Sequence, residues 1–562
     1  MRNKLVMRFC GYHFAVVCLT LLGASASQAA TYDVGPQKAH KTLGSVPWSH
    51  LGPGDTVRIH WRPEPYREKL MITASGTAAQ PIRIVGVPGP NRERPVLDGQ
   101  DATTSSQFDF PYVPTQDRGL IIFTRNKQQR YGVKPRFVEI EGLELRNASR
   151  GSNTSPNTFV DAAGQRRAYT FNAAALWVER GEHLVIRSCT LTGSGNGLFV
   201  SSGDDEALQS RGILVEGCHI YGNGNVGRDR EHNIYTEAIG VIFQSNHMGR
   251  LRSGAKGNNL KDRSAGTVVR YNWIEGGAHL LDLVEPEESR RLATMAPEYR
   301  KTYVYGNALL SGVGDGSSII HYGGDSGNTL IYRKGTLVFF NNTVVIRADQ
   351  SGQGARYRTI LFRLETNDES VEASNNIFYR SPATTGHPPT ELSLMSVAGS
   401  ARFAVNWISP GWALSRSGLP FTGGVRGTEH FISAKDNRPG FVDLLTDDLS
   451  LAVGSPCVGR AKPVDPVMHG GHGVKLQYVR HSSSRSRPAD SDLGAFSHEV
   501  GKARRDAVIH RARSTGGGSG RGASARSGAS RGAPSPLRRR RLVTFPPGVA
   551  VTESIVLVRG RR

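Results

Sequence analysis

The clearest pattern along the chain is a pair of core-type residues, two positions apart, that returns every 26 to 35 residues. The first member is Asn or Cys, and the second is aliphatic or aromatic. Residues two apart point to the same side of a β-strand. One such unit cannot bury its apolar side alone, so the repetition predicts a stack of coils, an all-β solenoid. The pairs begin at Cys189, Cys218, Asn246, Asn272, Asn307, Asn342, Asn376 and, more faintly, Asn406.

The repeated Asn residues have a physical role in such a stack. A side-chain amide both donates and accepts, so Asn at one turn position of every coil satisfies buried polar groups of the coils above and below. Cys189 and Cys218 occupy the same place in consecutive repeats, and we expect two small buried thiols there, although a disulfide between them stays open. Three Cys beyond residue 30 are too few for a disulfide framework.

Short Val-, Ile- and Thr-rich segments with Gly and Pro turns surround these repeats and show almost no helical periodicity. We interpret residues 31–119 as an N-terminal cap with the first coils, residues 120–415 as the core of the stack, and residues 416–497 as C-terminal coils and a cap. Between them, these ranges contain the candidate chemistry.

Several segments resemble a known family. Pro53-Gly-Asp-Thr-Val57, Val96-Leu-Asp-Gly99, Pro439-Gly-Phe-Val-Asp443 and Asp492-Leu-Gly-Ala-Phe496 are similar to the opening and closing coils of the pectate-lyase-like superfamily. The resemblance covers about residues 32–497 and implies a right-handed parallel β-helix. It fixes no activity, because this scaffold carries lyases, hydrolases, epimerases and inert adhesins.

The two ends differ from the rest. Residues 1–30 have a basic start, an apolar run and small residues at a candidate cleavage site, which predicts a signal peptide and a secreted or periplasmic protein. No later segment is long and apolar enough to span a membrane. Residues 498–562 are rich in Gly, Ser and Arg and predict a disordered basic tail. We expect a monomer.

The net charge of +22 is concentrated at these ends. Residues 501–562 hold 15 basic and 2 acidic side chains, and residues 1–30 contribute +3, which leaves +6 for residues 31–500. A mildly basic folded part suits an acidic polysaccharide and does not predict nucleic acid as the primary partner.

The sharpest candidate chemistry lies at Lys261 and Arg263, which share one side of an expected strand. Cleavage of a uronic-acid polymer by β-elimination needs a cation on the carboxylate, a base for the C5 proton and an acid for the leaving O4. Lys261 is the candidate base and Arg263 the candidate carboxylate partner. His232 or Tyr235 is the candidate proton donor.

The first residue of each repeated pair, Asn or Cys, serves as a marker for its coil. Counting from these markers places further residues on the same side of the stack. His321, Arg356 and Arg358 fall 14 to 16 positions after their markers, as His232 does. We take these three and Asn233 as candidates for substrate binding. The alternative without a functional role is that all of these residues belong to a solvated or packed sheet surface.

The segment around Lys261 also resembles alginate- and chondroitin-type lyases of this fold, which implies a base at Lys261. Those enzymes carry an Arg one coil later, where this chain has Asp282-Leu-Val-Glu285. Ca²⁺ bound by oxygen ligands is one replacement for that Arg, although no cofactor or metal site is assigned. Candidate ligands are Asp282, Glu285, Glu287 and Glu288.

Two other functions stay open. A non-catalytic glycan-binding or cell-surface protein fits the same fold, and a glycoside hydrolase would use paired carboxyl groups such as Asp204 and Asp205. The leading hypothesis is an exported lyase that cleaves an acidic, uronic-acid polysaccharide.

Overall fold

The computed structural model describes residues 29–151, 157–312, 314–347, 358–382, 391–466, 469–488 and 490–498. Arg356 therefore lies outside the described residues. So do the predicted signal peptide, apart from residues 29 and 30, and the basic tail, apart from residue 498. All the described residues belong to one compact unit. None of the helices in these ranges is long and apolar enough to cross a membrane.

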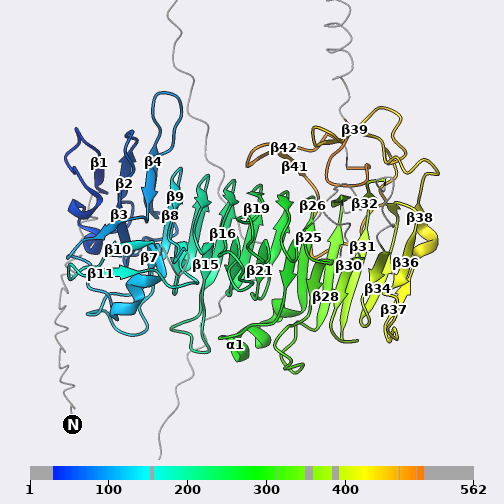
Figure 1. The fold of residues 1–562 in the computed structure, drawn as a ribbon, viewed down its shortest axis with the longest axis horizontal. Coiled ribbons are helices and arrows are strands. Elements are labelled where there is room, and N and C mark those ends of the chain that lie inside the picture. The colour runs from blue at the N-terminus through cyan, green and yellow to red at the C-terminus, as the bar shows by residue number, and fades with distance from the viewer. Residues whose placement is uncertain are drawn as a thin grey trace, which may run out of the picture. The chain divides into compact units, whose positions relative to one another are not determined.

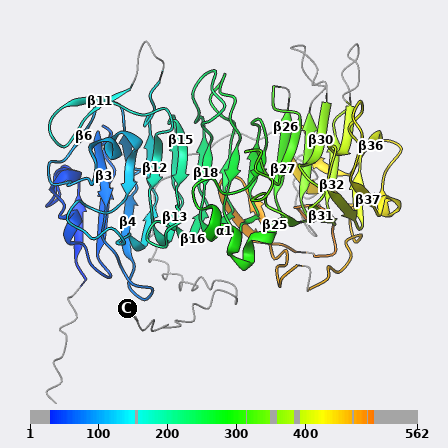
Figure 2. The same ribbon diagram turned by 90° about the horizontal axis from the view of Figure 1, so that it is seen from below.

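The chain winds through three long sheets in turn, so that each coil adds one strand to each sheet (Figure 1). Pairing between successive coils is parallel, and the expected all-β parallel β-helix is confirmed. Apolar side chains from all three sheets fill the interior as one continuous core. Figure 2 shows the same stack from below.

The first sheet carries the functional site. In spatial order it contains β11 (Arg166–Ala168), β10 (Thr158–Val160), β6 (Ala102–Thr104), β3 (Glu68–Ile72), β7 (Gly119–Phe123), β12 (Ala174–Val178), β15 (Asn196–Val200), β18 (Ile234–Thr236), β21 (Leu260–Asp262), β24 (Leu281–Leu283), β27 (Ser318–Tyr322), β30 (Arg358–Leu364), β33 (Glu391–Met395) and β36 (Trp412–Ser415).

The second sheet contains β1 (Thr31–Val34), β2 (Thr56–His60), β4 (Ile82–Val87), β8 (Arg136–Glu141), β13 (Glu182–Arg187), β16 (Arg211–Glu216), β19 (Ile239–Gln244), β22 (Val268–Arg270), β25 (Lys301–Tyr305), β28 (Gly335–Phe340), β31 (Glu369–Ser374), β34 (Ser400–Phe403) and β37 (Gly424–Arg426). The third contains β5 (Val96–Asp98), β9 (Glu144–Arg146), β14 (Thr190–Thr192), β17 (His219–Tyr221), β20 (His247–Met248), β23 (Trp273–Glu275), β26 (Ala308–Gly312), β29 (Thr343–Arg347), β32 (Ile377–Arg380), β35 (Asn406–Ile408) and β38 (Phe431–Ile432).

Helices are short and lie outside the sheets. They are α1 (Arg290–Met295) and the 3₁₀ turns η1 (Leu43–Ser45), η2 (Trp48–His50), η3 (Val113–Arg118), η4 (Pro297–Arg300) and η5 (Thr428–His430).

The Asn markers form the expected ladder at the turn into the third sheet. The side-chain oxygen of Asn307 accepts from the backbone N–H and the side-chain amide of Asn272, both at 2.9 Å, and Asn342 does the same for Asn307 at 3.0 Å. These amides are fully buried. The residue before most markers has a left-handed backbone, which Gly217 and Gly306 adopt without strain. Cys189 and Cys218 continue the series as free buried thiols.

The C-terminal part departs from the expected coils and cap over residues 416–497. The last coil ends at β38 (Phe431–Ile432), and the chain then runs back along the outer side of the third sheet as a strap, whose described residues are 441–466, 469–488 and 490–498. The strap contains the hairpins β39 (Phe441–Asp443) with β40 (Asp448–Leu451) and β41 (Leu476–Val479) with β42 (Ser483–Ser486). Leu451, Tyr478 and Phe496 pack on Trp273 and Tyr379 there. These apolar side chains cover the outward face of the third sheet.

The ladder yields a stability prediction. Asn307→Ala removes the acceptor for Asn272 and the donor to Asn342, and it leaves buried partners unsatisfied, so the free energy of unfolding should fall by about 2–4 kcal/mol. Urea unfolding followed by circular dichroism measures this loss. Asn91→Ala, at an exposed turn, is the matched control and should change it by less than about 0.5 kcal/mol. Equal effects of the two variants would contradict a stabilising ladder.

Candidate functional site

A single outward-facing row crosses the first sheet, with one residue from each coil. Parallel pairing without register shifts aligns the members, and the alternate positions point into the core. The row begins with stacked aromatic rings and continues with charged groups. Its members are Trp177, Phe199, Tyr235, Lys261, Asp282, His321 and Arg363.

A groove of about 880 Å³ lies over the middle of this row. Its floor comes from β18, β21, β24 and β27. Residues 228–232, residues 286–290 and the 323–333 loop, through Asp325 and Ser326, form its walls. The size lies within the range of ligand-binding clefts.

Two buried cations lie on the groove floor, and a carboxylate bridges them. Lys261 Nζ lies 2.6 Å from Asp325 Oδ2, and Arg263 Nη2 lies 3.0 Å from Asp325 Oδ1. Lys261 Nζ also lies 2.5 Å from Asp282 Oδ2. Arg263 donates further to the backbone oxygen of Glu285 at 2.7 Å. Both cations are less than a tenth exposed, so these pairs fix their positions.

The cations control the ionisation of their acidic partners. Burial alone raises the pKa of Asp282, but Lys261 and the His321 hydrogen bond outweigh it and hold that pKa well below its usual range. Burial likewise raises the pKa of Asp325, and Lys261 and Arg263 reverse the effect. Both carboxyl groups are therefore anionic at neutral pH, and each accepts a hydrogen bond from Lys261 Nζ.

Three histidines around the groove differ in protonation. Burial lowers the pKa of His232 to about 3 and that of His279 to about 4, with Lys261 adding to the first shift. Burial also lowers the pKa of His321, but hydrogen bonds to Asp282 (2.7 Å) and Glu365 (2.9 Å) raise it overall. His321 is thus the one of the three that holds its extra proton most strongly.

Hydrogen bonds also fix the neutral tautomers. The backbone N–H of Asn258 donates to His232 Nδ1 at 2.9 Å, so the ring proton of His232 lies on Nε2. His279 Nδ1 lies 2.9 Å from the backbone oxygen of Ser318, which only accepts. The proton of His279 therefore lies on Nδ1, and Nε2 carries a free lone pair.

A tyrosine and a glutamate pair form the far wall. The Tyr235 hydroxyl donates to Glu287 Oε2 at 3.2 Å, and burial raises the pKa of Tyr235 well above its usual value. Burial and a hydrogen bond with Glu237 raise the pKa of Glu288 to about 8. Glu237 in turn accepts from the backbone N–H groups of residues 287–289 and shapes this wall.

The structure brings most of the predicted site residues together. His232, Tyr235, Lys261, Arg263 and His321 all line the groove.

Three other predictions fall elsewhere. Asn233 points into the interior, where its amide donates to the backbone oxygen of Gly249 at 2.7 Å, so it supports the coil instead of facing substrate. Arg358 pairs with Glu391 at 2.9 Å and does not line the groove. Arg356 lies outside the described residues.

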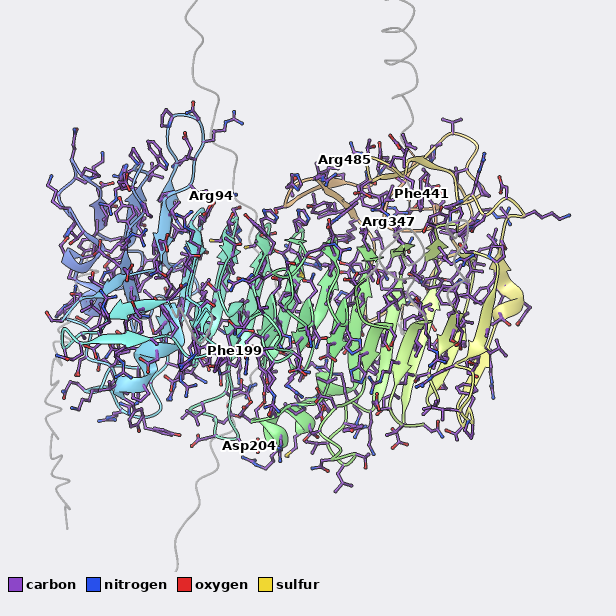
Figure 3. All side chains as sticks on the ribbon, in the orientation of Figure 1. Arg94, Phe199, Asp204, Arg347, Phe441 and Arg485 are labelled. Atoms are coloured by element: carbon purple, nitrogen blue, oxygen red, sulfur yellow. The ribbon has the colours of Figure 1, made fainter. Side chains whose placement is uncertain are left out.

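The Asp204 and Asp205 carboxyl groups proposed for hydrolysis also lie outside the groove lining. Asp204 accepts from the backbone N–H of Arg291 at 2.8 Å, and Asp205 accepts from that of Ala207 at 2.9 Å. Figure 3 shows Asp204 at the lower edge of the coils, below Phe199.

The carboxylates suggested for Ca²⁺ do not converge on one point. Asp282 faces Lys261 and His321, Glu285 caps the backbone of residues 325–326, and Glu288 contacts Glu237. Among the described residues, the ligand atoms of His279, Asp282 and His321 do lie within 4.8 Å of one another. Imidazole donors favour transition metals over Ca²⁺, and both oxygens of this Asp already have partners. The geometry therefore does not form a calcium cage.

Sequence reasoning missed other groove residues, of which His279, Asp325 and Arg363 bear on the chemistry. His279 follows a Gly-Gly-Ala turn, Asp325 lies in the irregular 323–333 loop, and Arg363 lies two coils beyond Asp282 in the row. Only Arg363 had a usable signal, because it stands on a regular strand whose register can be extended from Lys261.

No family model matches the chain, and no curated protein matches it. Several solved structures do. Pectate lyase Pel9A is 11% identical over 84% of this chain and 97% of that one, with a TM-score of 0.41. An alginate lyase from Paenibacillus sp. str. FPU-7 is 14% identical over 63% and 96%, with a TM-score of 0.38. A rhamnogalacturonan lyase is 13% identical over 86% and 98%, with a TM-score of 0.36.

The histidine environments predict a distinct titration. At pH 5, His232 and His279 should remain neutral because burial lowers their pKa values to about 3 and about 4, whereas His321 should be protonated. Nitrogen NMR of histidine-labelled protein measures this, with single His→Gln variants to assign the signals. Titration midpoints near pH 6.5 for His232 and His279 would contradict the described burial of these side chains.

Proposed function

We propose that this protein is an exported lyase that cleaves an acidic, uronic-acid polysaccharide by β-elimination. The observation that carries the proposal is the Asp325 carboxylate held between Lys261 and Arg263. A substrate carboxylate in the same position would contact the same two cations. The side chain of Asp325 is one-third exposed and belongs to a loop, which makes it the partner that a substrate replaces.

The cation pair supplies the activation that elimination needs. Lys261 and Arg263 withdraw charge from the uronate carboxylate and stabilise the enolate that forms when the C5 proton leaves. Their burial strengthens this effect, because few water molecules compete. The electrons of the C5–H bond form the C4–C5 double bond, the C4–O4 bond breaks, and O4 takes up a proton.

The base is better assigned to His279 than to Lys261. Lys261 Nζ already donates to two carboxylates, at 2.5 Å to Asp282 and 2.6 Å to Asp325, so it is positioned as a hydrogen-bond donor. His279 is neutral, and its Nε2 is the acceptor left open when Nδ1–H donates to Ser318. Asp282 lies close enough to stabilise the imidazolium that results. Lys261 and Arg263 then act together on the carboxylate.

Tyr235 suits the role of proton donor. Its raised pKa keeps the phenol protonated, and its hydroxyl faces the groove beside Glu287. His232 also presents a proton on Nε2 and is suited to hydrogen bonding with a sugar hydroxyl. These assignments place a base and an acid around one bound uronate, as elimination requires.

The activity test is a panel of uronic-acid polymers, followed by the ultraviolet absorbance of the unsaturated product. Lys261→Ala should lower kcat on the cleaved polymer at least about a hundredfold, because it removes charge stabilisation of the transition state. Lys301→Ala, an exposed lysine on the second sheet, is the matched control and should leave kcat unchanged.

The outcomes separate the competing functions. Binding without any cleavage would favour a non-catalytic glycan-binding protein. New reducing ends without ultraviolet absorbance would favour a hydrolase, in which Glu288, with its pKa raised to about 8, is the acid candidate in the groove. Elimination that survives Lys261→Ala would overturn the assigned site and leave the activity standing.

Replacement of Asp325 tests whether this carboxylate occupies the substrate position. Asp325→Asn removes the competing charge and should lower KM about tenfold, while it lowers thermal stability because two buried cations lose a partner. Steady-state kinetics and thermal unfolding measure both effects. Asp368→Asn, in an exposed pair with Lys334, is the control. A large loss of kcat with unchanged KM would instead place Asp325 among the catalytic groups.

A further inference from the structure

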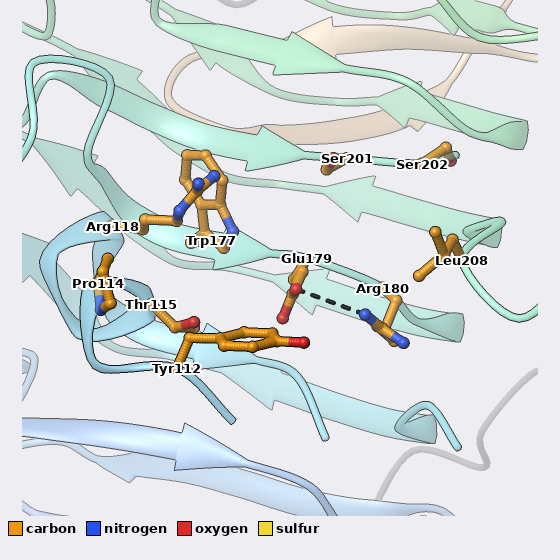
Figure 4. Close-up of a pocket in the computed structure, with 10 residues that line it drawn as sticks. All are labelled: Tyr112, Pro114, Thr115, Arg118, Trp177, Glu179, Arg180, Ser201, Ser202 and Leu208. Carbon is orange, nitrogen blue, oxygen red and sulfur yellow. Dashed lines mark hydrogen bonds and ion pairs between the residues drawn. The ribbon is translucent and has the colours of Figure 1, made fainter. Parts of the chain in front are cut away.

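A second hollow lies on the first sheet, on the N-terminal side of the groove (Figure 4). Its volume is about 320 Å³. Tyr112 and the η3 turn, with Thr115 and Arg118, line one part of it, and Trp177 on β12 and the following Glu179 line another. The proposed chemistry uses none of these residues.

The hollow belongs to the same row as the groove. Trp177 stacks on Phe199 with ring centres 4.0 Å apart, and Phe199 stacks on Tyr235 at 4.5 Å. Trp177 lines the hollow, whereas Phe199 and Tyr235 line the groove, so one stacked pair of rings separates the two spaces. Three coil spacings of ~4.8 Å place Trp177 about 14 Å from the row position of Lys261.

The hollow contains a cation without an ion pair among the described residues. Arg118 is exposed, its guanidinium lies 5.1 Å from the centre of the Trp177 ring, and the described residues provide it with no ion pair. The indole N–H of Trp177 is buried and has no acceptor among them. The acid present, Glu179, is engaged by Arg180 at 3.4 Å and by the Thr124 hydroxyl. A ligand with a negative charge would supply the partner that Arg118 lacks among the described residues.

We propose that this hollow is a remote subsite for a second uronate of the same polysaccharide chain, with its carboxylate on Arg118. The inference rests on the proposed function and deepens it. Substrate then runs along the row, across the coils, with one uronate at Lys261 and another three coils away. A disaccharide is too short to reach both positions, so the protein should bind long chains more tightly than short ones.

The test measures how the loss of one positive charge changes the affinity for short and for long oligosaccharides. Isothermal titration with di- and hexasaccharides of galacturonate, mannuronate and guluronate gives the affinities. Arg118→Ala should weaken binding of the preferred hexasaccharide about tenfold and leave the disaccharide unaffected, because a charge-assisted hydrogen bond is lost only for the longer ligand. Arg118→Glu should weaken it further. Arg426→Ala, an exposed arginine on the second sheet, removes the same charge elsewhere and should change neither affinity.

The outcomes distinguish this inference from the function on which it rests. If wild-type protein cleaves the polymer but Arg118→Ala binds the hexasaccharide as tightly as wild type, the subsite is overturned and the lyase stands. If Arg426→Ala weakens binding as much as Arg118→Ala does, the loss of affinity comes from the lower net charge of the protein, and the subsite is again overturned. If no uronic-acid oligosaccharide binds the wild-type protein, the proposed function fails and the subsite with it.

Discussion

The register between coils is the constraint on which the rest of the molecule depends. The Asn ladder from Asn246 to Asn406 links each coil to the next through amide hydrogen bonds in the buried interior. A slip of one residue would reverse every side chain of a strand and leave these amides without partners. The ladder therefore holds Tyr235, Lys261, Asp282 and His321 in line, although 86 residues of sequence separate the first from the last.

The charges in the groove nearly cancel in pairs, and this balance determines what can bind. Lys261 and Arg263 are deeply buried, which is costly for isolated cations, and Asp282 and Asp325 offset that cost. Asp282 stands on β24, which pairs with β21 on one side and with β27 on the other, so its position is fixed by the sheet. Asp325 reaches the site from a loop anchored by the fully buried pair of Arg333 and Asp262. One partner stands on a sheet strand and the other on a loop, and under the proposed function the loop partner is the one that a substrate carboxylate replaces.

The fold could be predicted from the sequence because its signal is local and periodic. The Asn and Cys markers identify each coil, and fixed offsets from them brought His232, Lys261, Arg263 and His321 to one groove. The ionic partners of Lys261 could not be predicted in the same way, since Asp325 lies 64 residues further along on an irregular turn. Asn233 was misjudged because it neighbours His232 but points to the opposite side of the chain. Residues 416–497 were predicted as C-terminal coils and a cap, and β37 and β38 are coil strands in this range, but the strap that follows has no periodic signal from which its path could be predicted.

The strap also affects how the protein reaches its final state. A stack of coils grows from one end, and its early coils can form before its late coils are made. The outward face of the third sheet is different, because Ser482 bonds to the backbone of Cys218 across 264 residues and Phe496 packs near Trp273. Those apolar side chains stay uncovered until nearly the whole folded region has been synthesised. The last step of maturation is thus the closing of a seam along the side of an already wound chain, and until then the unsealed face is open to self-association.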